Sequence, residues 1–213
     1  MNGLDLFSGI GGITLALKDY VRPVAYCEID PYCQSVLLSR MQTWDLPKAP
    51  IWDDIKTLRP IYIPFEIDIM YGGFPCQDIS VAGAGKGLDG ERSGLFFEIV
   101  RLAKEIKPQW IFLENVPAIT TRGGLRVVKE VAEMGYDCRW CVISAASVGA
   151  LHRRERWFLL AHSHSSRLQE ERTGKQAKIS LCGSGFYVAH TTSESSDRYT
   201  ERAATTHALL RIG

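Results

Sequence analysis

Short apolar runs alternate along the chain with segments whose apolar residues recur every three or four positions. The runs predict β-strands over residues 3–7, 24–27, 51–55, 67–71, 110–113, 138–144 and 157–161. The periodic segments predict helices over residues 13–19, 31–40, 94–106 and 122–134. Strands that alternate with helices in this way are typical of an α/β fold, in which helices cover a mostly parallel sheet.

The predicted core ends near residue 161. Beyond His162, the residue types Ser, Thr, Glu, Arg and Gly dominate, and apolar residues occur only in short runs. A segment of this composition buries too little apolar surface to form a core of its own. We therefore predict one domain over residues 1–161 and a polar, poorly ordered tail over residues 162–213.

The composition is that of an ordinary globular protein, with 46% hydrophobic residues, 23% charged residues and a formal net charge of +1. This charge neither indicates nor excludes DNA, so contact with a polyanion depends on local basic clusters. The chain start lacks a signal-peptide pattern and the six cysteines lack a secreted-scaffold spacing, which favours a reduced, cytoplasmic protein. No apolar run approaches the roughly 20 residues that span a bilayer, so we expect no membrane role.

Two sets of residues could bind a metal, and we expect neither to do so. Cys138 and Cys141 lie on one predicted strand and have no partner pair or histidine at zinc spacing. His162, His164 and His190 lie in Ser-rich segments, where histidines are more often solvated.

The first predicted strand runs directly into the glycine turn Ser8-Gly9-Ile10-Gly11-Gly12, which a helix follows. Glycine permits a tight turn, and free N–H groups at a helix start attract the anionic groups of a ligand. Glu28 follows the second strand, about 20 residues later, where an acid can bind ribose hydroxyls. A plain structural turn and a solvated carboxylate are the alternatives. Asp53 and Asp54, at the end of the third strand, either cap a helix or contact a ligand.

A cysteine follows the fourth predicted strand, in the segment Gly72-Gly73-Phe74-Pro75-Cys76-Gln77-Asp78-Ile79-Ser80. A thiol at a strand end is a candidate nucleophile, although an inert, buried cysteine is the alternative. Glu114 ends the next strand, so its carboxyl can converge with the Cys76 thiol as a general acid.

Two further segments carry candidate chemistry. The glycine-rich residues 81–92 predict either a mobile loop that closes over a substrate or a surface connection. Arg153, Arg154 and Arg156 surround Glu155, which suits phosphate contact and the bracing of a catalytic acid, or else a surface ion-pair cluster.

Taken in order, these motifs resemble those of the DNA (cytosine-5) methyltransferases. The matching segments are Asp5-Leu6-Phe7-Ser8-Gly9-Ile10-Gly11-Gly12, Glu28-Ile29-Asp30, Asp54-Ile55, Gly73-Phe74-Pro75-Cys76-Gln77-Asp78-Ile79-Ser80, Glu114-Asn115-Val116 and Arg154-x-Arg156. The resemblance implies a Rossmann-like, doubly wound methyltransferase sheet, mostly parallel with an antiparallel last strand. It also implies a cytoplasmic, DNA-associated protein of bacterial or phage origin.

The resemblance further implies a pocket for S-adenosylmethionine at the strand ends. The residues that would wrap its methionine part are Phe7, Ser8, Gly9, Ile10, Gly11 and Gly12. Glu28, followed by Ile29, would hold the ribose, and Asp54 with Ile55 would hold the adenine. Pro75 and Leu95 fall where the family also lines this pocket.

For catalysis, the resemblance implies that Cys76 adds to C6 of a cytosine flipped out of double-stranded DNA. This addition gives C5 the enamine character that it needs to accept a methyl group. Glu114 would hydrogen-bond N3 and the exocyclic amine of the base, and Arg154 and Arg156 would brace the site.

The sequence departs from the family in two ways. His152 stands where the family usually carries Gln before the arginines, and the chain ends without the target-recognition region and the closing motif. We therefore expect the catalytic front part of such an enzyme, either as a truncated product or as one subunit whose second chain supplies those parts.

Other functions stay open as alternatives. The first is a catalytically silent module that binds the cofactor or DNA. The second is a nicotinamide dehydrogenase, which would leave Cys76 and Glu114 without a role. Restriction-modification, protection of phage DNA and regulation are all compatible host processes.

Overall fold

The computed structural model describes residues 1–75, 94–163, 177–182 and 186–191, the last two ranges as strands. Cys76, the glycine-rich segment 81–92 and Ser93, the residue before the third predicted helix, lie outside the described residues. Their predicted roles therefore stay predictions.

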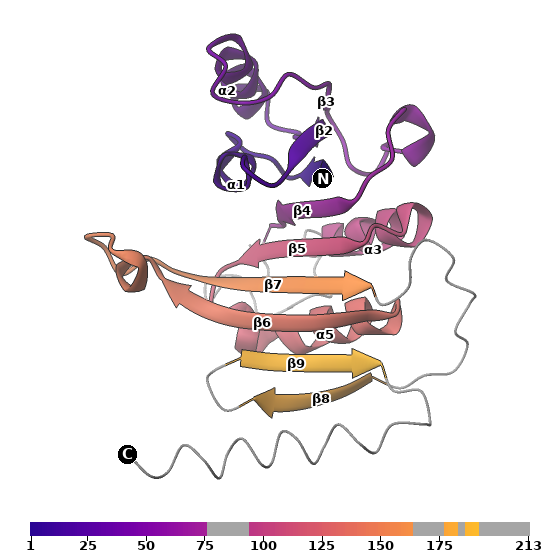
Figure 1. Ribbon diagram of the computed structural model, residues 1–213, viewed down its shortest axis with the longest axis vertical. Helices are drawn as coiled ribbons and strands as arrows, with labels where there is room; N and C mark the ends of the chain where they lie inside the picture. Colours follow the sequence, from indigo (N-terminus) through magenta and orange to yellow (C-terminus); the bar gives the residue numbers. More distant parts are fainter. Residues whose placement is uncertain (76–93, 164–176, 183–185, 192–213) are drawn as a thin grey trace.

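One sheet runs through all the described strands (Figure 1). The strands are β1 (Asn2–Leu6), β2 (Arg22–Cys27), β3 (Ile51–Trp52), β4 (Ile69–Gly73), β5 (Trp110–Asn115), β6 (Tyr136–Ser144), β7 (Glu155–Ser163), β8 (Ala177–Cys182) and β9 (Phe186–Thr191). Their order across the sheet is β3-β2-β1-β4-β5-β7-β6-β9-β8. The pairs from β3 to β5 are parallel, and β7 is antiparallel to both β5 and β6. The predicted fold class, with an antiparallel strand that ends the core, is therefore confirmed.

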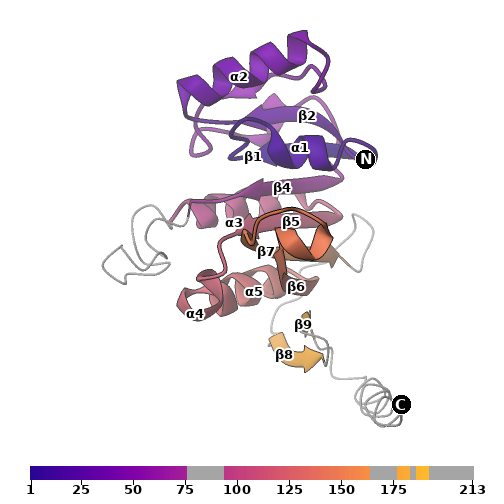
Figure 2. The ribbon, with the colours of Figure 1, turned by 90° about the vertical axis from the view of Figure 1, so that its left-hand side faces the viewer.

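Helices cover both faces of this sheet (Figures 1 and 2). Their bounds are Gly12–Ala16 for α1, Pro31–Gln42 for α2, Leu95–Ile106 for α3, Ile119–Arg122 for α4 and Gly124–Glu133 for α5, with short 3₁₀ turns at Pro60–Tyr62 (η1) and Ala145–Val148 (η3). Apolar side chains of α3 and α5 share one buried cluster with β1, β5 and β7. Helices α1 and α2 contribute to two smaller clusters, around Tyr71 and Tyr26.

Two predicted helices differ from the observed ones. The helix expected over 13–19 ends at Ala16, because the chain must turn back into β2, which starts at Arg22. The helix expected over 122–134 is divided at Gly123, whose φ of 151° lies outside the helical range. Helix α5 therefore begins at Gly124.

Strands β8 and β9 come from the segment for which the sequence predicts a polar tail. Strand β9 pairs with the outer edge of β6, and β8 pairs with β9, both antiparallel. A sheet edge offers a row of unpaired backbone groups, so a strand can join it without a large apolar contribution. The division of the chain at residue 161 stays a prediction.

Within the described residues, no helix is both long and apolar enough to cross a membrane.

Candidate cofactor and catalytic site

The glycine turn after β1 takes the compact form that its sequence predicts. Gly9 and Gly11 have φ values of 53° and 82°, which side chains rarely tolerate. A Cβ on Gly11 would also collide with the side chain of Leu46, so glycine is required there for two reasons. Phe7 enters the turn with a φ of 53°, an uncommon value for a residue other than glycine. Non-glycine residues in this region often lie at functional sites.

Glu28 fastens this turn to the end of β2. Its Oε2 accepts a hydrogen bond of 2.6 Å from the Gly9 N–H, and its Oε1 accepts one of 2.8 Å from the Asp30 N–H. The side chain is almost fully buried, whereas the neighbouring Ile29 is exposed. A carboxylate has about four lone-pair sites, so Glu28 keeps acceptor capacity for the hydroxyls of a ligand.

The two acids after β3 form a capped turn. Asp53 Oδ1 accepts a hydrogen bond from the Asp54 N–H, and Asp54 Oδ1 accepts one from the Lys56 N–H at 2.9 Å. Asp54 therefore caps a turn and not the predicted helix, because the next described helical segment begins only at Pro60, and the Asp53 bond to the adjacent N–H is too local to be a cap. The Ile55 side chain is buried in the core, so a ligand in this place would meet the backbone of Ile55 and not its side chain.

Glu114 of β5 and Arg156 of β7, two of the predicted catalytic residues, meet at the end of the sheet where β4 also ends. Gly73 pairs with Glu114 across the β4–β5 ladder, and a Cβ on Gly73 would lie only 2.6 Å from Glu114 Oε2. Glu114 Oε1 accepts a charge-assisted hydrogen bond of 2.6 Å from Arg156 Nε. Two described residues follow β4, and the second of them, Pro75, directly precedes Cys76. Arg156 thus contacts Glu114 beside the strand that leads to the cysteine, while the predicted convergence of Glu114 with the Cys76 thiol stays a prediction.

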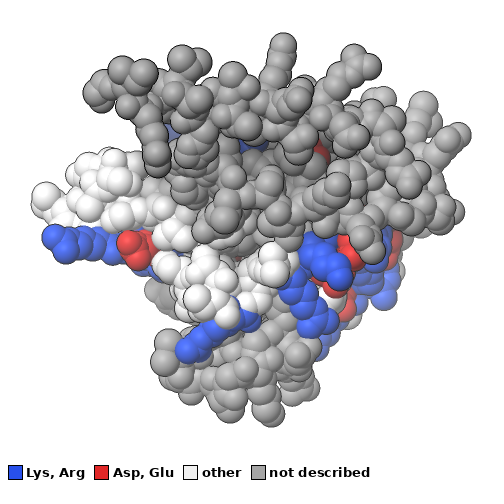
Figure 3. Space-filling view, turned by 90° about the horizontal axis from the view of Figure 1, so that it is seen from below, with Lys and Arg blue, Asp and Glu red and all other residues white. Residues whose placement is uncertain are grey.

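Arg154 lies apart from this pair. Arg154 is exposed to solvent, and its backbone N–H donates to His152 Nδ1 at 3.4 Å. On the face seen from below (Figure 3), described Lys and Arg side chains lie in separate groups, with Asp or Glu beside several of them. This distribution agrees with the small net charge of +1.

Sequence reasoning missed a buried polar cluster beneath the glycine turn. Thr14 Oγ1 donates to Asp5 Oδ2 at 2.6 Å and lies 2.7 Å from Tyr71 Oη, so the cluster joins α1, β1 and β4. Burial raises the pKa of the Asp5 carboxyl to about 7, and the charge of Glu28 adds to this effect against the opposing hydrogen bonds. The available signal in the sequence was an acid within an apolar strand, followed by a threonine on the far side of the glycine turn.

Asn115 was also missed as a positioning group, although the sequence places it in a motif. Its Nδ2 donates to the Phe74 carbonyl at 3.2 Å, and its Oδ1 accepts from the Val116 N–H at 2.8 Å. The buried side chain thus ties the end of β5 to the segment that leaves β4.

Of the remaining predicted pocket residues, Pro75 and Leu95 are half-buried and border the range 76–93. An open groove of about 500 Å³ lies along the β3 edge of the sheet, and of the candidate ligand contacts only Asp53 lines it. The described residues contain no group of three His, Cys, Asp or Glu side chains that could hold a metal.

The fold and the arrangement of the site are those of a class of cofactor-binding proteins. A mostly parallel sheet, with β7 inserted antiparallel between β5 and β6, carries a glycine turn and, at the next strand end, an acid, as in proteins that bind nucleotide-containing cofactors. The Dnmt2 methyltransferase of S. pombe has a similar structure, with a TM-score of 0.62 and 23% identity over 80% of this chain and 53% of that one.

The sequence comparisons identify the family. The chain is 38% identical over 159 residues to the type II methyltransferase M.CviJI of Paramecium bursaria Chlorella virus IL3A, covering 74% of this chain and 42% of that enzyme. It is 34% identical over 171 residues to the type II methyltransferase M.HhaI of Haemophilus parahaemolyticus, covering 78% and 50%. The sequence model described as C-5 cytosine-specific DNA methylase matches residues 1–207. The chain belongs to this family, as its motifs predict, and spans about half the length of these relatives or less.

Proposed function

We propose that the chain carries the S-adenosylmethionine-binding and catalytic residues of a DNA (cytosine-5) methyltransferase. The observation that supports this most is the Glu114–Arg156 pair, which lies against Gly73 in the strand that leads to Cys76. A carboxyl group fixed by an arginine beside a nucleophile suits the protonation and orientation of a cytosine ring.

In the proposed mechanism, the Cys76 thiolate forms a bond to C6 of the extruded cytosine, while the carboxyl of Glu114 hydrogen-bonds N3 and the exocyclic amine. S-adenosylmethionine, when bound, would supply the methyl group that the electron pair displaced from the C5–C6 bond takes up at C5, with S-adenosylhomocysteine as the leaving group. Loss of the C5 proton then expels the thiolate and restores the double bond. Arg156 holds the Glu114 carboxyl in place through these steps.

The cofactor would lie against the glycine turn, with its ribose beside Glu28 and its adenine beside Asp54. The fit rests on the geometry of the chain itself. Both oxygens of Glu28 are fixed by backbone N–H groups and keep free lone pairs, and ribose hydroxyls are hydrogen-bond donors.

A second candidate is a module that binds the cofactor without methylating DNA by itself. The chain covers 42% and 50% of the length of the two relatives, so methylation of DNA by the chain alone is part of the proposal. DNA as substrate, and a second chain as partner, belong to the proposal.

The test is transfer of tritiated methyl groups to DNA, measured with the chain alone and with the C-terminal half of M.HhaI added. Transfer in either reaction supports the proposed enzyme, and transfer only in the second supports a two-part assembly. Binding of S-adenosylhomocysteine without transfer in both reactions supports the silent module. Binding of NAD in preference to S-adenosylhomocysteine would favour the dehydrogenase.

A further inference from the structure

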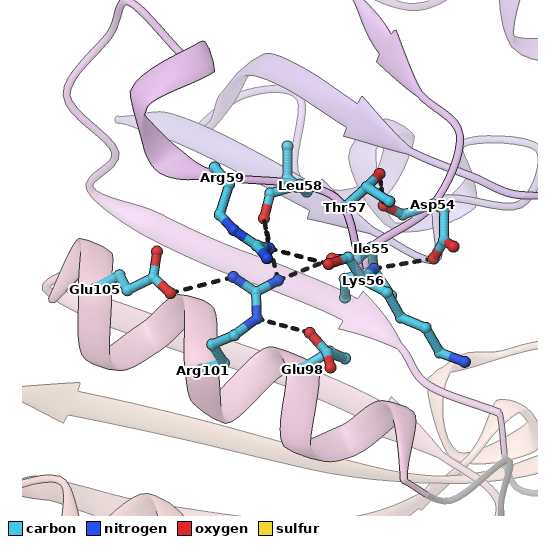
Figure 4. Close-up of polar contacts among 9 residues, drawn as sticks. All are labelled: Asp54, Ile55, Lys56, Thr57, Leu58, Arg59, Glu98, Arg101 and Glu105. Atoms are coloured by element: carbon cyan, nitrogen blue, oxygen red, sulfur yellow. Dashed lines mark hydrogen bonds and ion pairs between the residues drawn. The ribbon is translucent and has the colours of Figure 1, made fainter.

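Arg101 of α3 makes contacts that none of the roles above uses (Figure 4). Its Nε lies 2.7 Å from Glu98 Oε2 and its Nη1 lies 3.2 Å from Glu105 Oε1, both on the same helix. Its Nη2 donates to the backbone carbonyls of Ile55 and Leu58, at 2.9 and 3.0 Å. Two carboxylates therefore fix the guanidinium so that its remaining donors face a segment more than 40 positions away in the sequence.

That segment is the turn from Asp54 to Leu58. The Thr57 and Leu58 N–H groups both donate to the Asp54 carbonyl, so the chain makes a single helical turn. The Asp54 carboxylate caps the start of this turn. At the other end, the Ile55 carbonyl, which also accepts from the Leu58 N–H at 3.3 Å, and the Leu58 carbonyl both receive the Arg101 guanidinium, whose charge suits the negative end of the turn's dipole.

We propose that Arg101 is a positioning residue that holds the Asp54–Leu58 turn in place for recognition of the adenine base. This inference rests on the proposed function, in which Asp54 and the backbone of Ile55 receive the adenine. Helix α3 begins at Leu95, which is assigned to the same pocket. The helix thus supplies one wall through Leu95 and braces the other through Arg101, so that one rigid element sets the distance between them.

Arginine is required because one planar group serves four acceptors. Its fork donates in three directions at once, to Glu98, to Glu105 and to the turn. A lysine has a single nitrogen, so it can satisfy only some of these acceptors. Arg59 also donates to the carbonyls of Lys56 and Leu58. It directly follows the turn in the sequence, however, so these bonds do not connect the turn to α3.

The first arm of the test needs no ligand. Hydrogen exchange of the Thr57 and Leu58 amides is measured in the unaltered chain, in Arg101→Met and Arg101→Lys, and in Lys104→Ala, an exposed position on the same helix. We expect these amides to exchange roughly tenfold faster or more in Arg101→Met, less so in Arg101→Lys, and unchanged in Lys104→Ala. Unchanged exchange in a folded Arg101→Met chain would overturn the positioning role. If Arg101→Met does not fold, Arg101→Lys decides.

The second arm compares S-adenosylhomocysteine with S-inosylhomocysteine by calorimetry. The 6-amino group of adenine can donate to the Asp54 carboxylate, whereas the 6-oxo group of the inosine compound cannot. We expect Arg101→Met to weaken S-adenosylhomocysteine about 10- to 100-fold. We expect a smaller loss for the inosine compound, so that the preference between the two falls while Lys104→Ala keeps it.

The outcomes separate the two claims. Equal weakening of both ligands, or none, in a folded variant would overturn the adenine role of the turn and leave the proposed function standing. If the unaltered chain binds neither ligand at millimolar concentration while Arg101→Met still speeds amide exchange, the proposed cofactor role fails and the brace itself stands.

Discussion

The buried carboxyl of Asp5 predicts an unusual pH dependence of stability. Only 1% of this residue is exposed, and its Oδ1 has no hydrogen-bond partner in the described part of the chain. Desolvation is the main reason that its pKa rises from 3.8 to about 7. The Glu28 charge raises it further, while hydrogen bonds from Thr14 and Ser8 lower it.

The direction of the effect follows from proton binding. In the unfolded chain the Asp5 carboxyl has its ordinary pKa of 3.8, whereas in the folded protein it keeps a proton up to about pH 7. The folded state therefore binds more protons between these values, so the free energy of unfolding falls as the pH rises from about 4 to about 7. A difference of this size in pKa corresponds to a total of about 4 kcal/mol, a large part of the stability of a typical domain.

Replacing Asp5 by Asn should remove this dependence. The amide keeps the carbonyl that accepts from Thr14, but its NH₂ group lacks an acceptor at the Oδ1 position, which costs about 1–3 kcal/mol at every pH. We expect Asp5→Asn to be less stable than the unaltered chain at pH 5. Between pH 5 and pH 8, the difference should move by about 3 kcal/mol in favour of the variant.

Urea unfolding followed by tryptophan fluorescence measures this directly, since the chain has five Trp. Asp19→Asn, at an exposed carboxyl in the connection after α1, is the matched control and should leave the pH profile unchanged. Parallel profiles for the unaltered chain and Asp5→Asn would refute the reasoning, because they would mean that Asp5 releases its proton at the same pH in both states.

Three further predictions concern the catalytic end, in the assembly that transfers methyl groups to DNA. Cys76→Ala should abolish transfer and covalent trapping by 5-fluorocytosine DNA while S-adenosylhomocysteine affinity stays within a few-fold; comparable turnover would exclude Cys76 as the nucleophile. Glu114→Gln should lower kcat about 10²- to 10⁴-fold in single-turnover assays with little change in thermal stability, and an unchanged kcat would make Glu114 structural. Gly73→Ala should also lower kcat, because its Cβ would lie 2.6 Å from Glu114 Oε2 and displace the carboxylate from Arg156. Full activity in Gly73→Ala would show that the position of this carboxylate is not critical.

The features that could be predicted from the sequence are those that local rules decide. The glycine turn, the start of α2 at Pro31 and the acid at the end of β5 all follow from residue type and from the positions of strand ends. The pattern predicted the fold class but not the order of the strands in the sheet, because that order depends on which apolar faces pack together. The break at Gly123 had a local signal in adjacent glycines, but helical periodicity on both sides concealed it.

Contacts between distant segments could not be predicted in the same way. Arg101 lies on a helix whose apolar residues mark a core face, and its two glutamate neighbours indicate ordinary pairs along a helix. Nothing local shows that the same guanidinium reaches Ile55 and Leu58. The burial of Asp5 likewise depends on the packing of α1 over β1 and β4, which brings Thr14 to its carboxyl and Tyr71 to the Thr14 hydroxyl.

For Asp54, the two alternatives that the sequence left open, a cap and a ligand contact, are compatible with one another, whereas the solvated carboxylate considered for Glu28 is wrong because this side chain is almost fully buried. Asp54 caps a turn with Oδ1, and Glu28 uses both oxygens to hold the glycine turn and the start of the next helix. Each of these bonds occupies one lone pair of a carboxylate that has about four, so a structural role leaves acceptors for a ligand. The backbone bonds also fix the direction in which the remaining lone pairs point. In this site a cap is therefore what makes a carboxylate a precise acceptor, because a side chain that is already held loses less entropy when the ligand binds.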